Sequence, residues 1–196
     1  MLEIEQKFAR VDFADLERRL AAWGATPGIS LEEADHYFNA PDRDFARTDE
    51  VFRLRRVGSA NYLTYKGPKR PTAVKTRVEL EVPISGGDRA AEQFIELVKH
   101  LGYRPVAVVR KRRRQYQLQR GVFVLTVCLD EVEGLGAFAE LEILAPEEQQ
   151  AEAATMLANT ANALGLFEVE RRSYLGLILA AGASEGGGAT RREART

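Results

Sequence analysis

Residues 1–8 read MLEIEQKF, and Glu3, Glu5 and Lys7 occupy alternate positions in this stretch. Side chains two residues apart in an extended strand point to the same side, so the stretch predicts a strand with one charged face and one largely apolar face. A half-solvated antiparallel strand is the simplest interpretation of such a pattern. The pattern of the other strands indicates whether this charged face is exposed to water or turned toward an interior.

Charged and apolar residues alternate in the same way in later segments. EVFRLRRV (50–57) sets Arg53 and Arg55 on one face of a predicted strand, and RKRRRQYQL (110–118) sets Lys111 and Arg113 together. Over all such segments the charged faces carry seven acids, Glu3, Glu5, Glu79, Glu81, Asp130, Glu140 and Glu142, and seven bases, Lys7, Arg53, Arg55, Lys66, Arg77, Lys111 and Arg113. If these faces met only water, they would have no reason to be so poor in Ser, Thr, Asn and Gln.

The arrangement of the predicted elements favours an α+β fold dominated by an antiparallel sheet. Besides the opening strand, extended segments are predicted at 34–39, 50–57, 61–67, 74–84, 106–119, 122–132 and 137–144. Amphipathic stretches with capping residues predict helices at 12–25, 88–103 and 146–165, and a short helix is expected over 173–181. Turn residues between the strands are typical of hairpins, and eight strands are enough to close a β-barrel with flanking helices.

Composition and length indicate one domain in a reducing compartment. The chain has 196 residues and a formal net charge of −1, which gives no overall attraction to nucleic acid or membrane. Its single cysteine, Cys128, cannot form an internal disulfide, and the start lacks a signal-peptide pattern. We therefore expect a soluble cytoplasmic protein with one domain over 1–181 and a flexible tail over 182–196, which has no apolar residue larger than alanine.

The charged faces suggest a ligand if the strands close with these faces inward. Burying so many charges is costly unless they are paired or share a ligand. Arginine and lysine clusters suit phosphate oxygens, whereas carboxylate clusters without histidine or cysteine suit a hard cation such as Mg²⁺ or Mn²⁺. The pattern therefore predicts a tunnel for a metal-bound polyphosphate.

The motifs, taken in order, resemble the CYTH superfamily, the triphosphate tunnel metalloenzymes. They are E-x-E-x-K at 3–7, R-L-R at 53–55, Y-K-G-P at 65–68, E-L-E at 79–81, K-x-R-x-x-Y at 111–116 and D-x-V-x-G-L-G-x-F-x-E-x-E at 130–142. RRSYLGLIL near the end resembles the closing segment of the family. The resemblance runs from Glu3 to about Ile178.

This resemblance implies an eight-stranded antiparallel β-barrel, the triphosphate tunnel, with basic residues on the phosphates and carboxylates on the metal. The implied phosphate ligands are Lys7, Arg53, Arg55, Lys66, Lys111, Arg113 and Arg172. The implied metal ligands are Glu3, Glu5, Asp130, Glu140 and Glu142, with Glu79 and Glu81 either ligands or partners that orient the bases. Glu5, Lys7 and Glu142 are the expected catalytic residues. The resemblance assigns no role to Arg77 or His36.

The resemblance also implies an activity, with alternatives. The first is metal-dependent hydrolysis of inorganic triphosphate or an organic one such as thiamine triphosphate at the terminal phosphate. The alternative is a class IV adenylate cyclase that converts ATP to cyclic AMP and pyrophosphate, and the second alternative is a non-catalytic polyphosphate- or nucleotide-binding module. The expected partner is a small-molecule triphosphate, with no nucleic acid and no membrane, and a homodimer would be one way to cover the apolar outer faces.

Overall fold

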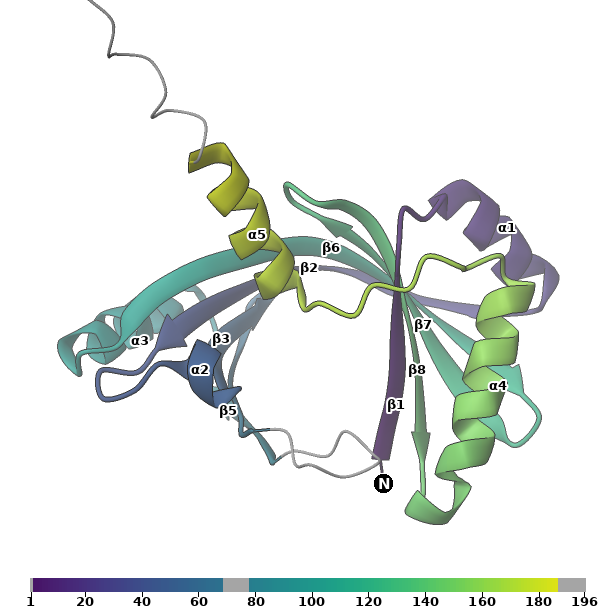
Figure 1. Ribbon diagram of the computed structural model, residues 1–196, viewed down its shortest axis with the longest axis horizontal. Helices are drawn as coiled ribbons and strands as arrows, with labels where there is room; N and C mark the ends of the chain where they lie inside the picture. Colours follow the sequence, from purple (N-terminus) through teal and green to yellow (C-terminus); the bar gives the residue numbers. More distant parts are fainter. Residues whose placement is uncertain (1, 69–77, 187–196) are drawn as a thin grey trace, which may run out of the picture.

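Eight antiparallel strands form a single sheet in the computed structural model, which describes residues 2–68 and 78–186 (Figure 1). The strands are β1 (Leu2–Ala9), β2 (Thr26–Asn39), β3 (Val51–Val57), β4 (Ala60–Lys66), β5 (Glu79–Ile84), β6 (Arg104–Arg120), β7 (Phe123–Val132) and β8 (Gly136–Ala145). The helices are α1 (Phe13–Ala22), α2 (Phe45–Thr48), α3 (Asp88–His100), the 3-10 turn η1 (Glu147–Gln149), α4 (Gln150–Ala163) and α5 (Tyr174–Gly186). The predicted α+β class with an eight-stranded antiparallel sheet is confirmed.

The sheet curls around its charged face into an incomplete barrel (Figure 1). Its strand order is β1-β8-β7-β6-β2-β3-β4-β5, and within the described residues the two edge strands, β1 and β5, do not pair with each other. The two edges nevertheless lie opposite each other (Figure 1), so Lys66 and Glu79 on one side influence the pKa of Glu3 on the other. The first part of the predicted strand 74–84 lies outside the described residues.

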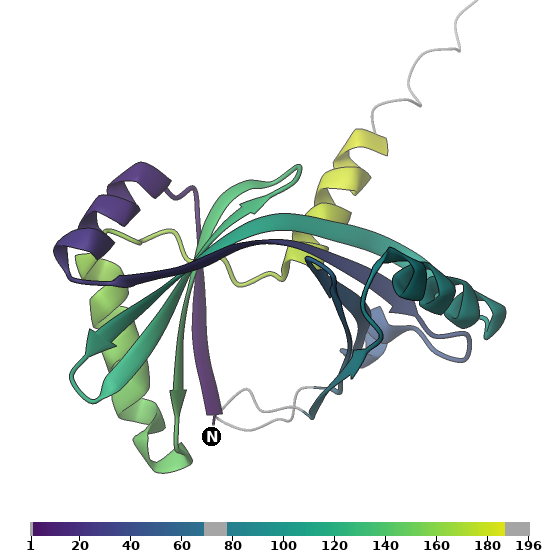
Figure 2. The same cartoon turned by 180° about the vertical axis from the view of Figure 1, so that it is seen from behind.

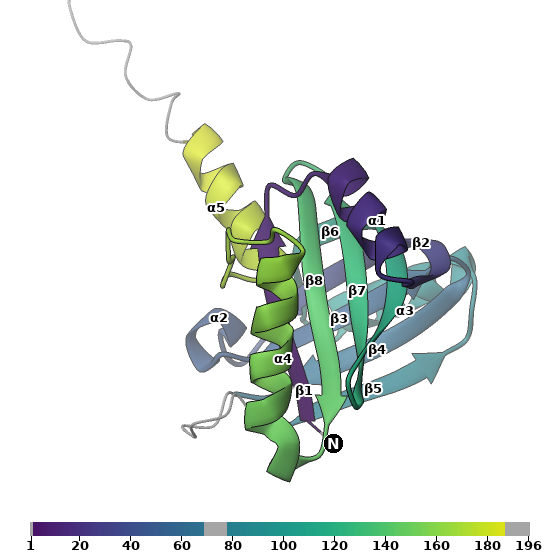
Figure 3. The same cartoon turned by 90° about the vertical axis from the view of Figure 1, so that its right-hand side faces the viewer.

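The apolar sides of the strands face outward and are covered by helices on two sides. α1 and α4 pack on β1, β8 and β7, where Leu125, Leu129 and Leu141 are fully buried (Figure 3). α3 covers β2, β3 and β4 around Phe38 and Leu54 (Figure 2). Apolar burial on this outer side leaves the concave side of the sheet to the charged residues.

The ends of several elements differ from the sequence prediction for local reasons. Asp12 caps α1 as expected, with its carboxylate accepting a hydrogen bond from the backbone N–H of Asp15. β2 begins at Thr26 and not at residue 34. A register shift between Pro27 and Ser30 lets the first part of β2 pair with β6, although its sequence does not alternate regularly. α5 continues to Gly186, past 181, because the alanine-rich stretch has no helix-breaking proline. The remainder of the predicted tail, 187–196, lies outside the described residues.

The first turns of α5 fill one part of the sheet's concave side. Tyr174 and Leu177 form an apolar cluster there with Tyr37, Val109 and Phe138, which come from β2, β6 and β8. The helix thus brings a tyrosine hydroxyl beside the charged residues described below. No helix in the described part of the chain combines the length and apolar character needed to cross a membrane.

The outer core predicts a contrast between two leucines of β8. Leu141→Ala removes a fully buried side chain and should lower the free energy of unfolding by about 2–5 kcal/mol. Leu144→Ala, at a position that is 62% exposed, should change it by less than about 0.5 kcal/mol. Urea unfolding followed by circular dichroism measures both, and equal losses would contradict the assignment of the core to the outer side.

Candidate functional site

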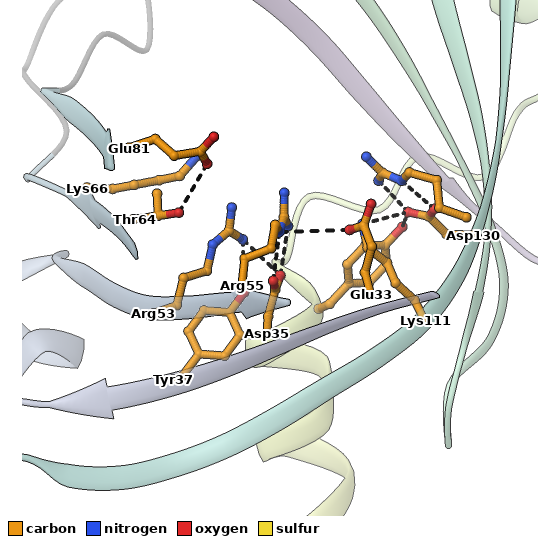
Figure 4. A network of polar contacts seen from close by, with 12 residues as sticks. Glu33, Asp35, Tyr37, Arg53, Arg55, Thr64, Lys66, Glu81, Lys111 and Asp130 are labelled. Carbon is orange, nitrogen blue, oxygen red and sulfur yellow. Dashed lines mark hydrogen bonds and ion pairs between the residues drawn. The ribbon is translucent and has the colours of Figure 1, made fainter. Parts of the chain in front are cut away.

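A buried carboxylate on β2 holds two arginines of β3 in place; we call Asp35, Arg53 and Arg55 the Asp35 cluster (Figure 4). The β2–β3 register sets Asp35 directly opposite Arg55, and Arg53 lies two residues before Arg55 on the same face. Arg55 donates two hydrogen bonds of 2.7 Å to the two carboxylate oxygens, and Nη1 of Arg53 donates one of 2.9 Å. The hydroxyl of Tyr37 lies 3.4 Å from the same Nη1.

A second buried carboxylate, Asp130, holds two bases of β6 in place; we call Asp130, Lys111 and Arg113 the Asp130 cluster. Asp130 on β7 lies opposite Arg113 and is fully buried. It accepts hydrogen bonds of 2.7 and 2.6 Å from Arg113 and of 3.4 Å from Lys111. The hydroxyl of Tyr174, from α5, donates a further one of 2.8 Å. With four donors already around it, Asp130 is placed to orient bases, although the resemblance implied that it binds metal.

Both carboxylates stay ionised because of these contacts. Burial alone would raise the pKa of Asp35, but the hydrogen bonds from Arg55 and the charges of Arg53 and Arg55 outweigh burial and hold it below its ordinary value of 3.8. The pKa of Asp130 is likewise lowered, since Arg113 and Lys111 outweigh the effect of burial. The two clusters are therefore fixed arrays of charged side chains at neutral pH.

Glu33 lies between the two clusters. Its Oε2 atom is 3.1 Å from Nζ of Lys111 and 3.8 Å from Nε of Arg55 (Figure 4). From the sequence, neither Glu33 nor Asp35 is assigned to the site, because Glu33 lies before the predicted strand 34–39 and Asp35, although within it, belongs to none of the motifs. Glu33, Asp35 and Tyr37 alternate at the same period of two as the opening strand, and this pattern could have revealed them.

Three carboxylates gather where β1 meets β8; we call Glu3, Glu5 and Glu142 the acid triad. Glu5 is directly opposite Glu142 in the register, and one oxygen from each of the three residues lies within 4.8 Å of the others. Burial raises the pKa of Glu142 to about 7, assisted by the charges of Glu140, Glu3 and Glu5 and opposed by Arg113. Burial and Glu5 also raise the pKa of Glu3.

The acid triad fits a divalent cation. Within the described residues, none of its three carboxylates takes part in a hydrogen bond or an ion pair with another side chain. Glu3 and Glu5 are exposed, so water and more distant bases together relieve the mutual repulsion in part. Three converging carboxylate oxygens are the ligand type that Mg²⁺ and Mn²⁺ prefer. Glu3, Glu5 and Glu142 could therefore hold such an ion.

Glu140 and Lys7 connect the acid triad to the Asp130 cluster. Glu140 lies 3.8 Å from Nζ of Lys7 and also accepts a hydrogen bond from Arg113. Nζ of Lys7 is 4.2 Å from the centre of the Tyr174 ring, and burial lowers the pKa of Lys7 despite the opposing charge of Glu140. The predicted residues Lys7, Arg113, Glu140 and Glu142 are thus brought together from three strands.

The remaining acids of the predicted site lie on β5. Glu79 forms a 2.7 Å ion pair with Lys66 on β4, and Glu81 accepts a 3.2 Å hydrogen bond from Thr64. The resemblance left these acids as either metal ligands or partners that orient bases. The ion pair between Glu79 and Lys66 is the contact expected of such a partner. Lys66 in turn acts on Glu3 across the gap between the sheet edges.

Other residues singled out by the sequence lie apart from these groups. The side chain of Arg172 is 60% exposed, and its contacts within the described residues are with Glu170. His36 lies on the face of β2 opposite to Asp35, where burial together with Arg110 and Arg56 lowers its pKa. Cys128 is fully buried, and burial raises the pKa of its thiol to about 12, so it is an unreactive packing residue. Arg77 lies outside the described residues.

Known proteins resemble this chain over most of its length. The pattern that defines the CYTH domain matches residues 1–174. Adenylate cyclase CyaB of Aeromonas hydrophila is 33% identical over 180 residues, which are 88% of this chain and 86% of that protein. A protein of Methanocaldococcus jannaschii with a provisional adenylate cyclase name is 37% identical over 142 residues, 72% of this chain and 77% of that one. The solved PH1819 protein of Pyrococcus horikoshii has 36% identity and a TM-score of 0.76, with 92% of this chain and 99% of that chain covered.

The Asp35 cluster predicts a pH-dependent loss of stability. Asp35→Asn should lower the free energy of unfolding at pH 7 by about 3–5 kcal/mol, because the buried Arg53 and the half-buried Arg55 lose the carboxylate that they both contact. The folded-state pKa of Asp35 is lowered, so its contribution is complete above about pH 4 and is lost as the pH falls through that lowered value.

Urea unfolding of the wild-type protein and the variant at several pH values tests this prediction. The difference between them should shrink on acidification below pH 4, and Asp42→Asn, at an exposed carboxylate, should show almost no difference at any pH. A gap that stays constant into acid would mean that Asp35 does not act through its charge.

Proposed function

The chain belongs to the CYTH family, and we propose that it is a divalent-metal-dependent enzyme that binds a triphosphate along the concave side of its sheet and hydrolyses the terminal phosphate. Enzymes of this family are triphosphatases or class IV adenylate cyclases. The observation that carries the proposal is the adjacency of the acid triad to the Asp130 cluster, which Glu33 in turn links to the Asp35 cluster. Such an adjacency suits a polyphosphate that is bound together with a metal ion.

The basic clusters supply the phosphate contacts in this proposal. Arginine has five N–H donors, and Asp35 uses only one nitrogen of Arg53 and two of Arg55. Nε of Arg53 is buried and, among the described residues, has no hydrogen-bond partner. Donors held in place by a buried carboxylate lose little entropy when phosphate oxygens reach them, which favours binding.

The acid triad supplies the metal site, with Mg²⁺ and Mn²⁺ as the candidate ions. A bound divalent ion would polarise phosphate oxygens and acidify a coordinated water. Glu3, Glu5 and Glu142 hold the ion, whereas Glu140 orients Lys7 and Arg113 toward the same region. The ammonium of Lys7 and the guanidinium of Arg113 then stabilise negative charge that grows on the phosphate oxygens during bond cleavage.

Hydrolysis and cyclisation differ in what they require from the site. Hydrolysis needs a triphosphate site, a metal site and water, and the acid triad and the basic clusters support the first two requirements. Cyclisation needs ATP in place of any other triphosphate. Cyclisation of ATP is the second candidate, favoured by the adenylate cyclase names of the two relatives above 30% identity. A non-catalytic module could bind a metal-bound polyphosphate with the same groups, so turnover is what distinguishes it from an enzyme.

Phosphorus NMR of the purified protein tests the proposed reaction. The protein is incubated with Mg²⁺ or Mn²⁺ and, in parallel, with inorganic triphosphate, thiamine triphosphate or ATP. Orthophosphate together with a diphosphate product is the expected result. Pyrophosphate and cyclic AMP from ATP would instead establish the cyclase, and no turnover of any of the three substrates would contradict both enzymatic proposals.

The acid triad predicts a separation of metal binding from phosphate binding. Glu142→Gln should lower metal-dependent turnover by about 100-fold or more, since even outer-shell changes at metal sites cost about 10–100-fold. The affinity for Mn²⁺, measured by electron paramagnetic resonance, should fall in parallel.

Binding of inorganic triphosphate in the presence of EDTA should remain in this variant, because the basic clusters are intact. Glu152→Gln, an exposed change on α4, is the matched control and should leave all three quantities unchanged. Full turnover by Glu142→Gln would remove Glu142 from the metal site.

A further inference from the structure

Glu33 differs from the other carboxylates that contact the basic clusters. Asp35 and Asp130 each accept at least three hydrogen bonds from the bases that they orient. Oε2 of Glu33 is buried and accepts no hydrogen bond within the described residues, although Nζ of Lys111 is only 3.1 Å away. Oε2 is attracted electrostatically to Lys111 and Arg55, but it makes none of the hydrogen bonds that would fix these bases in place.

The bases around Glu33 do not depend on it for their placement. Lys111 also contacts Asp130 at 3.4 Å, and Arg55 is held by two hydrogen bonds to Asp35. Each base therefore keeps a counter-charge if the charge of Glu33 is removed. Lys111 and Arg55 belong to different clusters, so Glu33 occupies the junction where a ligand that spans both clusters would bring its own negative charge (Figure 4).

We propose that Glu33 is a built-in counter-charge that competes with phosphate at the junction of the two clusters and thereby weakens the binding of polyphosphate. This inference rests on the proposed function, in which the clusters bind phosphates. A carboxylate at this point lowers the positive potential that a phosphate meets, and its buried position limits screening by salt. The penalty is larger for an anion that contacts both clusters than for one that contacts a single cluster.

Binding of inorganic triphosphate and of orthophosphate in EDTA, measured by isothermal titration calorimetry, tests this role. Glu33→Gln keeps the shape of the side chain and removes its charge, and it should bind triphosphate about ten-fold more tightly than the wild-type protein. Orthophosphate should gain less. Glu32→Gln is the matched control, because Glu32 is the neighbouring residue, its side chain is 78% exposed and it faces Arg112 on the other side of the sheet.

The outcomes separate this inference from the proposed function. Unchanged or weaker triphosphate binding by Glu33→Gln, with normal binding by the wild-type protein, would overturn the role of Glu33 and leave the function standing. No triphosphate binding by the wild-type protein would overturn both. An equal gain in Glu32→Gln would show a general charge effect and would also overturn the role of Glu33.

A second variant and a stability measurement guard against a folding artefact. Glu33→Ala removes the same charge without adding an amide and should also bind triphosphate more tightly than the wild-type protein. Thermal unfolding of all variants shows whether they fold. Tighter binding cannot come from a partly unfolded site, so the direction of the change distinguishes the proposed role from a purely structural one.

Discussion

Charged groups removed from water must be compensated, and the sheet's concave side is organised by this requirement. The outward faces of the strands carry the apolar residues that pack against the helices, together with exposed charges such as Arg112 and Glu32, whereas the buried charged side chains lie on the inside. There Asp35 and Asp130 each face two bases on a neighbouring strand, at positions set by the antiparallel register. The same register that builds the sheet therefore also builds the two basic clusters.

The charges are not balanced equally everywhere on the concave side. We assign function to the two places where they are least balanced, the acid triad and Glu33. In the acid triad, one oxygen of each carboxylate lies within 4.8 Å of the others, and burial, assisted by the neighbouring acids, raises the pKa of Glu142 to about 7. A cation would relieve this unfavourable arrangement. At the other extreme, Glu33 adds a negative charge to bases that already have partners. In this account, metal and phosphate complete an interior that the protein alone leaves out of balance.

Alternation at a period of two was sufficient to predict the strands, their facing and most of the charged interior. The placement of Glu5 and Glu142 in one site came from the resemblance to the CYTH family, whose separate motifs converge there. The alternation could not predict that β1 and β5 are unpaired within the described residues, since closure of a sheet depends on long-range geometry that no local pattern contains. Glu33 was missed because Pro27 and Gly28 disguise the start of β2, and Asp35 because it belongs to none of the motifs. The contact between Arg172 and Glu170 depends on a loop whose path periodicity does not describe.

The most direct test of the central claim is a crystal structure of the protein with Mn²⁺ and a non-hydrolysable triphosphate analogue, with anomalous scattering used to locate the manganese. The account predicts an anomalous peak within coordination distance of Glu3, Glu5 and Glu142, with phosphate groups on the Asp35 and Asp130 clusters. Manganese away from the acid triad, or phosphates bound only on the outer face of the sheet, would contradict it.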